Sequence, residues 1–186
     1  MTVIQTEIHD VLLIKPGIFR DDRGAFLESF SARRYRDHAI TQDWVQDNLS
    51  TSVYGVIRGL HYQRPPFAQA KIVQVIRGRI LDVVVDIRKG SPTYGKHVAV
   101  ELDSEDRMQI LVPHGFAHGF SVLSPFADVL YKTDNYYSRD HEAGLRFDDP
   151  DLSIDWRIPS DQAILSPKDL ELPCLKDLST DFEYQS

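Results

Sequence analysis

Cysteine is almost missing from this sequence: Cys174 is the only one in 186 residues, so no disulfide bond can form within the chain. Nothing in the sequence therefore asks for an oxidising compartment, and we expect a cytoplasmic protein. Long apolar runs are missing as well. The N-terminal segment lacks the basic start and apolar stretch of a signal peptide, and its longest early apolar run, residues 11–14, is too short to cross a membrane. We expect no membrane association.

Basic residues are also scarce relative to acidic ones. The chain has 21 Lys and Arg against 28 Asp and Glu, which gives a formal net charge of -7. Nucleic-acid binding needs clustered cations that neutralise many phosphates, so this balance argues against a nucleic-acid partner. A small anionic ligand needs only two or three local cations. With 42% hydrophobic residues, the chain can build one core, and we expect a single domain over residues 1–186.

What the sequence does contain is a series of short runs rich in Val, Ile, Phe and Tyr, separated by Gly, Pro and Asp. This pattern predicts an all-β fold. The clearest part is residues 71–88, where two apolar runs flank Gly78 and predict a long, mostly buried hairpin. Further strands are expected at residues 12–15, 25–30, 56–62, 97–102, 108–112, 119–123 and 128–133.

Helical patterns are rare. Only residues 31–39 look helical, with Ser31 as the N-cap. After Pro150 the composition shifts to Asp, Pro, Ser and isolated Leu, which is typical of loops and one-turn helices covering a barrel. Many short strands at regular spacing favour a closed barrel or a double-sheet jelly roll with short peripheral helices, because closure removes exposed sheet edges.

One predicted strand carries two residues suited to chemistry, Arg58 and His61. They are three residues apart and would lie on opposite faces of a regular strand, whereas a bulge near Gly59 would turn both inward. A single histidine in a strand is more often a hydrogen-bonded structural residue than a catalytic one. The residues around it change that balance.

Two motifs resemble those of the cupin barrel. The segment from Pro113 through Gly115 to His118 matches the second cupin motif, PxGxxH, and Gly55 followed by His61 resembles the first. Metal-binding cupins place a second histidine and a glutamate where this chain has Gln63 and Lys71. An ammonium group repels a divalent cation, and neither residue replaces the missing ligands, so we expect no metal.

A pocket without metal or nucleophile can still remove a proton next to a carbonyl, which needs a base, an acid and a group that stabilises the enolate. His61 suits the base because imidazole is largely neutral at pH 7. Lys71 suits the stabiliser, although a lysine is more often a solvated surface residue. The segment containing Tyr131, Tyr136 and Tyr137 supplies phenols that could donate a proton or pack in the core.

Taken together, these motifs resemble the dTDP-4-dehydrorhamnose 3,5-epimerase family over residues 19–169. The matching segments are FRDDRGAFLE at 19–28, QDN at 46–48, GVIRGLHYQ at 55–63, PPFAQAK at 65–71, PHGFAHGF at 113–120, VLYKTDNYYS at 129–138 and LSPKD at 165–169. The resemblance implies a jelly-roll cupin homodimer that uses no cofactor and epimerises dTDP-4-keto-6-deoxy-D-glucose at C3 and C5 in dTDP-L-rhamnose biosynthesis.

The resemblance also implies roles for individual residues. His61 would be the base, Tyr131 the acid, Asp169 the carboxylate that orients the base, and Lys71 the group facing the keto oxygen. Contacts to the dTDP-sugar would fall on Arg23, Glu28, Gln46, Asn48, Arg58, His118, Tyr137, Glu142 and Lys168, with Arg23 and Glu28 reaching in from the partner subunit.

Three alternatives remain open at this level. A relative from secondary metabolism would invert only one carbon of a dTDP-keto sugar, and the same base, acid and lysine would serve it. A metal-dependent cupin would need ligands that Gln63 and Lys71 do not supply. A silent sugar-nucleotide-binding module would be expected to have lost His61 or Tyr131, and both are present.

Overall fold

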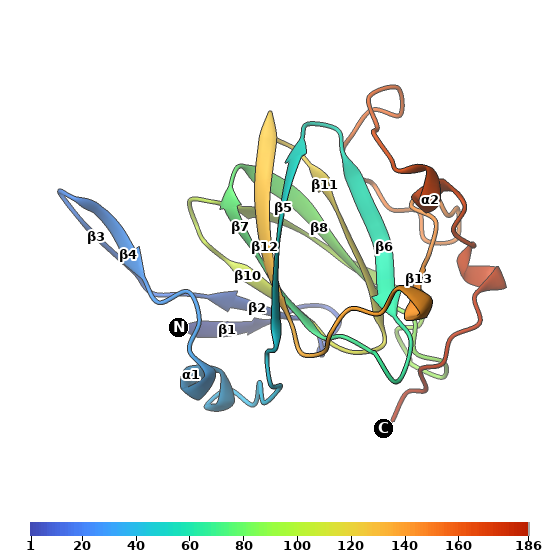
Figure 1. Cartoon of the computed structure of the whole chain (residues 1–186), viewed down its shortest axis with the longest axis horizontal. Helices are drawn as coiled ribbons and strands as arrows, with labels where there is room; N and C mark the ends of the chain where they lie inside the picture. The colour runs from blue at the N-terminus through green and yellow to red at the C-terminus, as the bar shows by residue number, and fades with distance from the viewer. Residues whose placement is uncertain (186) are drawn as a thin grey trace.

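Two antiparallel sheets face each other in the computed structural model, which describes residues 1–185, and their inner faces enclose the core (Figure 1). Ser186, the last residue of the predicted domain, lies outside the described residues. One sheet has six strands in the order β1-β2-β10-β7-β12-β5, the other has five in the order β13-β6-β11-β8-β9, and β3 pairs only with β4. The predicted all-β jelly roll with short peripheral helices is confirmed.

The strands of the six-stranded sheet are β1 (Thr2–Gln5), β2 (Leu12–Lys15), β10 (Gln109–Val112), β7 (Lys71–Arg77), β12 (Phe126–Thr133) and β5 (Gln46–Val53). Those of the five-stranded sheet are β13 (Glu142–Gly144), β6 (Ile57–Gln63), β11 (Phe116–Val122), β8 (Arg79–Asp86) and β9 (His97–Asp103). The remaining elements are β3 (Ile18–Asp21), β4 (Gly24–Leu27), the helices α1 (Ala32–Arg36) and α2 (Pro167–Leu170), and the single-turn helices η1 (Arg139–His141) and η2 (Leu175–Asp177).

Strand β8 shows how the core is divided. Ile80 and Val84 point into the barrel and join its inner apolar cluster. Leu81, Val83 and Val85 point outward into a second apolar cluster that the C-terminal segment covers. Because both faces of β8 are buried, its sequence is a nearly continuous apolar run rather than an alternation.

The predicted hairpin of residues 71–88 is wrong, although both of its strands exist. β7 pairs with β10 and β12, whereas β8 pairs with β11 and β9, so the two strands belong to different sheets. The chain crosses between the sheets at Gly78, which has φ +84° and where a Cβ would lie 2.1 Å from the carbonyl oxygen of Phe126. Only glycine fits this corner without strain.

Most other strand predictions agree with the structure to within a few residues. The strand predicted at 12–15 is β2, and those predicted at 97–102, 108–112 and 128–133 correspond to β9, β10 and β12. The strand predicted at 25–30 ends at Leu27, because the chain then turns toward α1. Strands β1, β3, β5 and β13 lie outside the predicted ranges: β1 and β3 have four residues each, β5 is rich in polar residues and half exposed, and β13 has three residues.

The predicted helix is shorter than expected. α1 ends at Arg36 rather than at residue 39, and Ser31 caps it, its Oγ accepting a hydrogen bond from the backbone of Arg34. After Pro150 the chain forms loops, α2 and η2, as predicted, and these cover the outer face of the five-stranded sheet. Within residues 1–185, no helix is both long and apolar enough to cross a membrane.

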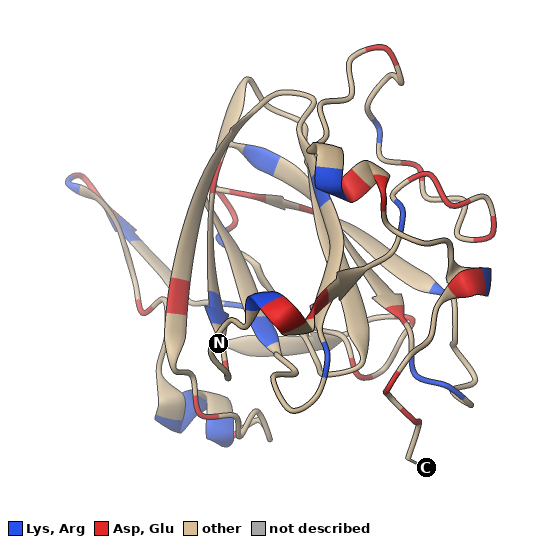
Figure 2. Ribbon diagram, turned by 45° about the vertical axis from the view of Figure 1, so that its right-hand side comes forward, with Lys and Arg blue, Asp and Glu red and all other residues tan. Residues whose placement is uncertain are grey.

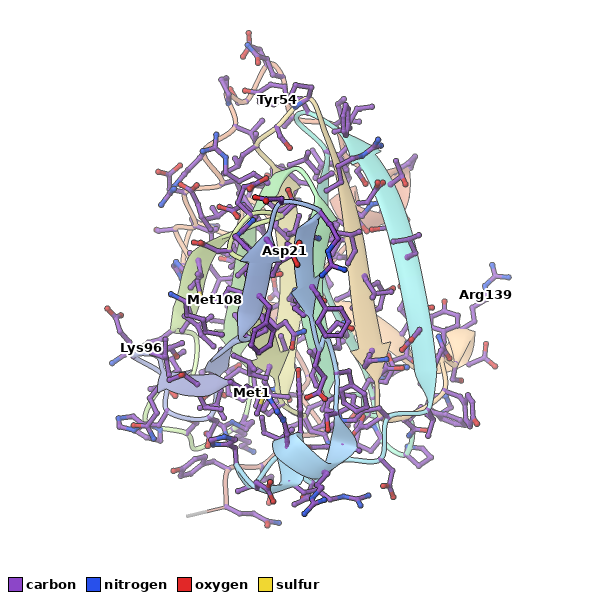
Figure 3. All side chains as sticks on the ribbon, turned by 90° about the vertical axis from the view of Figure 1, so that its left-hand side faces the viewer. Met1, Asp21, Tyr54, Lys96, Met108 and Arg139 are labelled. Carbon is purple, nitrogen blue, oxygen red and sulfur yellow. The ribbon has the colours of Figure 1, made fainter. Side chains whose placement is uncertain are left out.

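The hairpin of β3 and β4 stands away from the barrel (Figure 1). Asp21 lies near its tip, as Figure 3 shows from the side on which the hairpin faces the viewer. Phe19 and Phe26 are cross-strand neighbours on this hairpin, and each is 71% exposed. Charged residues of both signs are spread along the ribbon, except on α1, where all three charged residues are arginines (Figure 2).

Candidate active site

A pocket of about 500 Å³ opens between the two sheets. A smaller pocket of about 300 Å³ adjoins it, sharing His61, Lys71, Tyr131 and Glu142. Every predicted site residue except Arg23 and Glu28 lines one or both of them. The larger pocket also contains Arg58, His118, Lys168 and Asp169, and the smaller adds Gln46, Asn48 and Tyr137.

A bulge in β6 turns both Arg58 and His61 toward this space. His61 pairs with His118 of β11, but Arg58 pairs with Phe120, so two residues of β6 lie opposite the single residue Gly119. The bulge lies at the expected place, Gly59, where φ is +122° and a Cβ would lie 2.6 Å from the Cα of Gly119. A regular strand would have sent Arg58 and His61 to opposite faces.

His61 is held by a buried carboxylate. Its Nε2 lies 2.7 Å from Oδ1 of Asp169, whose residue is only 3% exposed. Burial alone would raise the pKa of Asp169, but hydrogen bonds from His61 and from Ser166 and the positive charge His61 can carry lower it overall. Asp169 therefore stays ionised, and because a carboxylate only accepts, Nε2 carries the proton and Nδ1 keeps its lone pair.

Helix α2 positions this carboxylate. Ser166 is its N-cap, with Oγ accepting from the backbone nitrogen of Asp169 at 3.2 Å, and Pro167 occupies the first turn. Both residue types are favoured at these positions because they satisfy or remove free N–H groups. The short helix thus brings a residue 108 positions away in sequence next to His61.

Lys71 begins β7 and points into the barrel from the six-stranded sheet. Its Nζ donates to the backbone oxygen of His61 at 3.4 Å, a long hydrogen bond. Removal from water lowers the pKa of Lys71 to about 8, while the charges of Asp82 and Glu142 oppose that shift. Lys71 is therefore mostly an ammonium ion at neutral pH, in contact with the pocket.

Tyr131 lies on the wall opposite His61. It belongs to β12 of the six-stranded sheet, whereas His61 belongs to β6 of the five-stranded sheet (Figure 1). Both side chains line the same pocket. Burial raises the pKa of Tyr131, an effect that Arg58 partly offsets. The phenol is thus protonated at neutral pH and can donate a proton from the face opposite the imidazole.

A charged network joins the loops at the pocket mouth. Glu142 of β13 pairs with Lys168 of α2, with Oε1 and Nζ 2.5 Å apart, and its Oε2 accepts from the hydroxyl of Tyr137 at 2.7 Å. Burial works against its charge, but these two partners lower the pKa of Glu142 overall. Arg58, which is exposed, donates to Oγ of Ser52 at 3.0 Å. Gln46 and Asn48 hydrogen-bond each other at 3.0 Å.

A second histidine–aspartate pair lies in the barrel interior and includes a residue that the sequence analysis missed. Nε2 of His118 is 2.9 Å from Oδ2 of Asp82, which is fully buried. A charged residue inside an otherwise apolar strand, such as Asp82, is a sequence signal by which a functional residue could be found. Asp86, four residues on, has the same appearance but binds Arg88 and Ser91 in a structural network, so the pattern alone does not separate the two.

Two predicted binding residues lie outside the pockets. Arg23 pairs with Asp21 in the turn of the β3–β4 hairpin, and its side chain is 90% exposed. Glu28 follows that hairpin and pairs with Arg34 at 3.2 Å. Within one chain, neither residue reaches His61.

Gln63 stands where metal-binding cupins have their second histidine, and its side chain makes a structural contact. Oε1 of Gln63 accepts from the backbone nitrogen of Ser138 at 2.9 Å, which ties β6 to the loop before η1. In the described part of the chain, no three His, Cys, Asp or Glu side chains are grouped so that they could hold a metal ion. Independence from metals stays a prediction for chelation to test.

A jelly-roll barrel with an imidazole and a phenol on facing walls of one pocket, and an ammonium group beside them, has the groups needed to move a proton next to a carbonyl. Residues 5–177 match the family described as dTDP-4-dehydrorhamnose 3,5-epimerase. A relative of that name from Shigella flexneri is 48% identical over 171 residues, which cover 91% of this chain and 93% of the relative. The chain belongs to the dTDP-4-dehydrorhamnose 3,5-epimerase family.

Solved structures agree in fold. The Legionella pneumophila dTDP-6-deoxy-D-glucose-3,5-epimerase, crystallised with dTDP-4-keto-L-rhamnose, superposes with a TM-score of 0.95 at 45% identity and covers 100% of this chain and 99% of its own. ChmJ, a 3'-monoepimerase from Streptomyces bikiniensis solved with dTDP-quinovose, gives a TM-score of 0.85 at 34% identity, covering 92% of this chain and 87% of its own. The same fold therefore serves enzymes of both kinds.

Proposed function

We propose that this protein converts dTDP-4-keto-6-deoxy-D-glucose into dTDP-4-keto-L-rhamnose by inverting C3 and C5. The observation that carries the proposal is the placement of His61 and Tyr131 on opposite walls of one pocket. Inversion requires that a proton leave one face of the sugar ring and that another arrive on the opposite face. C3 and C5 both neighbour the C4 ketone, so both of their protons are acidified by it.

His61 is the base in this proposal. Its Nδ1 lone pair takes the proton from carbon, and the imidazole becomes an imidazolium. Asp169, 2.7 Å from Nε2, holds the ring in the tautomer that leaves Nδ1 free and stabilises the positive charge that forms. A base placed in this way typically contributes roughly 10²–10⁴-fold to the rate.

Lys71 stabilises the enolate. When the C–H bond breaks, its electron pair moves into the ring and negative charge develops on the C4 oxygen. An ammonium group next to that oxygen lowers the energy of this state, an effect worth roughly 3–4 kcal/mol when one such donor is lost from an enzyme. Lys71 is the cation that points into the barrel beside His61.

Tyr131 completes each inversion. Its hydroxyl donates a proton to the carbon from the face opposite His61, and the enolate electrons return to form the new C–H bond. The raised pKa of Tyr131 keeps the phenol protonated until that step. The proton taken by His61 is then released to solvent and the phenolate is reprotonated, so the enzyme ends each cycle unchanged.

The degree of sequence identity to the relatives favours inversion at two carbons over inversion at one. Relatives named 3,5-epimerases are 48% and 45% identical to this chain, whereas the 3'-monoepimerase ChmJ is 34% identical. The catalytic groups alone do not separate the two outcomes, because the same base, acid and lysine serve both. The difference lies in how the ring is held between the walls.

The dTDP group occupies the mouth of the pockets in this proposal. Arg58 and Lys168 supply positive charge for the diphosphate, and Gln46, Asn48 and Tyr137 supply hydrogen bonds. Lys168 exchanges its contact with Glu142 for a phosphate oxygen. His118 lines the sugar end.

A homodimer is part of the proposal. The hairpin of β3 and β4 stands clear of its own barrel with Phe19 and Phe26 each 71% exposed, a surface that association would bury. Docked on a second copy, the hairpin brings Arg23 and Glu28 to the partner's pocket, which accounts for their distance from the pocket of their own chain. Sedimentation of the wild type and of Phe26→Asp measures this directly: we expect a dimer and a monomer respectively, and a monomeric wild type contradicts it.

We also place the protein in the cytoplasm. The chain has one cysteine and therefore no internal disulfide. Nucleotide-activated sugars are made from nucleoside triphosphates, which are a cytoplasmic resource, so an enzyme that acts on them works in the same compartment. Fractionation of cells that express the tagged protein tests this placement, and recovery of the tag outside the cytoplasmic fraction would refute it.

The configuration of the product tests the reaction. The protein is incubated with dTDP-4-keto-6-deoxy-D-glucose, and the mixture is reduced with borohydride and hydrolysed to free 6-deoxyhexoses. Two inversions give L-rhamnose and 6-deoxy-L-talose, whereas an unchanged substrate gives quinovose and fucose of the D series. Recovery of D-sugars alone, at protein concentrations that match the substrate, contradicts the proposal.

A further inference from the structure

Asp82 lies inside the barrel beneath the pocket and has no role in the mechanism above. It belongs to β8 and pairs in register with Phe120 of β11, which lines the larger pocket. Residues paired in this way direct their side chains to the same face of a sheet, so Asp82 points toward the six-stranded sheet that carries Lys71. Its exposed fraction is 0%.

Only one oxygen of this carboxylate is hydrogen-bonded. Oδ2 accepts from Nε2 of His118 at 2.9 Å, whereas Oδ1 has no hydrogen-bond partner among the described residues. A buried carboxylate is costly unless a cation compensates its charge. His118 supplies a hydrogen bond, and Lys71 is a cation that lines the same pocket as His118.

Lys71 carries a positive charge that has few partners. The protein around its ammonium group removes much of the water that would otherwise stabilise the charge, and the single hydrogen bond it donates is 3.4 Å long. Of the two carboxylates whose charges favour the ammonium form, Asp82 has the larger effect and Glu142 the smaller. Glu142 is already paired with Lys168 and hydrogen-bonded to Tyr137. Asp82 is hydrogen-bonded to His118 through Oδ2 alone, and its Oδ1 has no partner among the described residues.

The other titratable groups around Lys71 do not replace Asp82 as the negative charge that favours its ammonium form. Asp82 of β8 lies beside the pocket that Lys71 lines. The other titratable or charged groups that line this pocket are Arg58 and His61 of β6, His118 of β11, Tyr131 of β12, Glu142 of β13, and Lys168 and Asp169 of α2. His61 is held by Asp169, and Tyr131 is a neutral phenol at working pH. His118 donates its Nε2 proton to Oδ2 of Asp82, which leaves Oδ1 of that carboxylate without a partner among the described residues.

We propose that Asp82 is a positioning residue of the epimerisation, whose buried carboxylate keeps Lys71 in its ammonium form and fixes His118 with its proton on Nε2. This inference rests on the proposed function, in which Lys71 stabilises the enolate. Asp82 touches neither the sugar nor the reacting atoms. It acts through Lys71, and its loss leaves the base and the acid in place but reduces the fraction of enzyme with a charged lysine.

The consequence is a change in pH dependence. A lysine that must be charged gives an activity that falls as pH rises through its pKa, which for Lys71 is about 8. Asp82 favours the charged form of Lys71, and removing an opposite charge of this kind lowers a lysine pKa, by roughly 1 unit where the two groups lie within about 6 Å. Without Asp82, the alkaline fall in kcat therefore moves toward neutral pH by about one pH unit, and lowering the pH restores activity.

The test compares Asp82→Asn with the wild type. Asparagine keeps the shape and can still accept from Nε2 of His118, but it carries no charge. The matched control is Asp148→Asn, which removes an exposed carboxylate paired with Arg146 at 2.8 Å, outside the pocket. We expect kcat of Asp82→Asn near the wild-type value at pH 6 and a midpoint of the alkaline limb about one unit lower, with no shift in the control. A loss of kcat by the same factor at every pH indicates a structural role and overturns the proposal.

A second readout does not depend on activity. The rate at which acetic anhydride modifies Lys71, measured against pH by mass spectrometry of the peptide, gives the pKa of this lysine in each variant. We expect a lower value in Asp82→Asn than in wild type, and equal values overturn the proposal even if the proposed reaction holds. If the asparagine variant does not fold, Asp82→Ser, which leaves room for water, takes its place. A wild type that folds and is modified normally but epimerises nothing refutes the proposed function instead.

Discussion

Replacing Asp169 with asparagine separates the contribution of the His61–Asp169 pair from that of the rest of the pocket. The carboxylate accepts from Nε2 of His61 at 2.7 Å and is almost fully buried. An asparagine amide in the same place can donate to Nε2, which favours the tautomer with the proton on Nδ1. The base would then face the substrate with a proton instead of a lone pair, and no charge would stabilise the imidazolium.

We expect kcat to fall by roughly 10²–10⁴-fold, the range over which a general base contributes. This corresponds to a barrier higher by about 3–5 kcal/mol. The assay is product formation from dTDP-4-keto-6-deoxy-D-glucose under saturating substrate, with KM measured separately. KM should change little, because Asp169 contacts His61 rather than the nucleotide. The reasoning is refuted if Asp169→Asn turns over within a few-fold of wild type while Asp148→Asn does the same.

The same variant has a stability signature. The pKa of Asp169 is lowered in the folded protein by its contact with His61 and by the cap of α2, against the effect of burial. A carboxyl whose folded pKa is depressed adds stability above its unfolded pKa of about 3.9, and this stability is lost as pH falls through the folded pKa. Below about pH 4, the free energy of unfolding should therefore fall more steeply for wild type than for Asp169→Asn, as denaturant titrations will show.

Three further substitutions test other parts of the account. In Tyr131→Phe we expect epimerisation to fall by roughly 10²–10⁴-fold while solvent deuterium still enters the substrate, because His61 still removes protons; loss of both in parallel argues against separate roles. Gly78→Ala should lower the thermal midpoint strongly, since a Cβ there would lie 2.1 Å from the oxygen of Phe126, and an unchanged midpoint would show that the corner can relax. Ser166→Ala should cost about 1 kcal/mol of unfolding free energy and weaken the hold on Asp169, so kcat should fall less than in Asp169→Asn; an equal fall contradicts this ranking.

The sequence predicts those strands whose residues are apolar in a local pattern, and it fails where pairing is decided at long range. Residues 71–88 contain two strands as expected, but whether they pair depends on β9–β12 rather than on the turn itself. Gly78 is compatible with both a hairpin and a corner between sheets. Strand β5 was missed because its outer face is solvated and its residues are polar, so its place is set by β12.

The site was predictable to the extent that its residues lie in contiguous motifs. His61, Lys71, His118 and Tyr131 stand in segments whose order and spacing resemble one family, and the structure brings them to one pocket. Asp82 lies in a run of apolar residues with no motif around it. Its inward direction follows only from the pairing of β8 with β11, which no local pattern reveals.

The measurement that tests the central claim most directly is proton NMR of dTDP-4-keto-6-deoxy-D-glucose in heavy water with protein pretreated with EDTA. The account predicts that the C3 and C5 proton signals both disappear as deuterium replaces hydrogen, at rates that His61→Ala abolishes. Exchange at only one carbon would assign the protein to the single-epimerase relatives. Exchange that begins only when a metal ion is restored, or that survives in His61→Ala, would contradict the account.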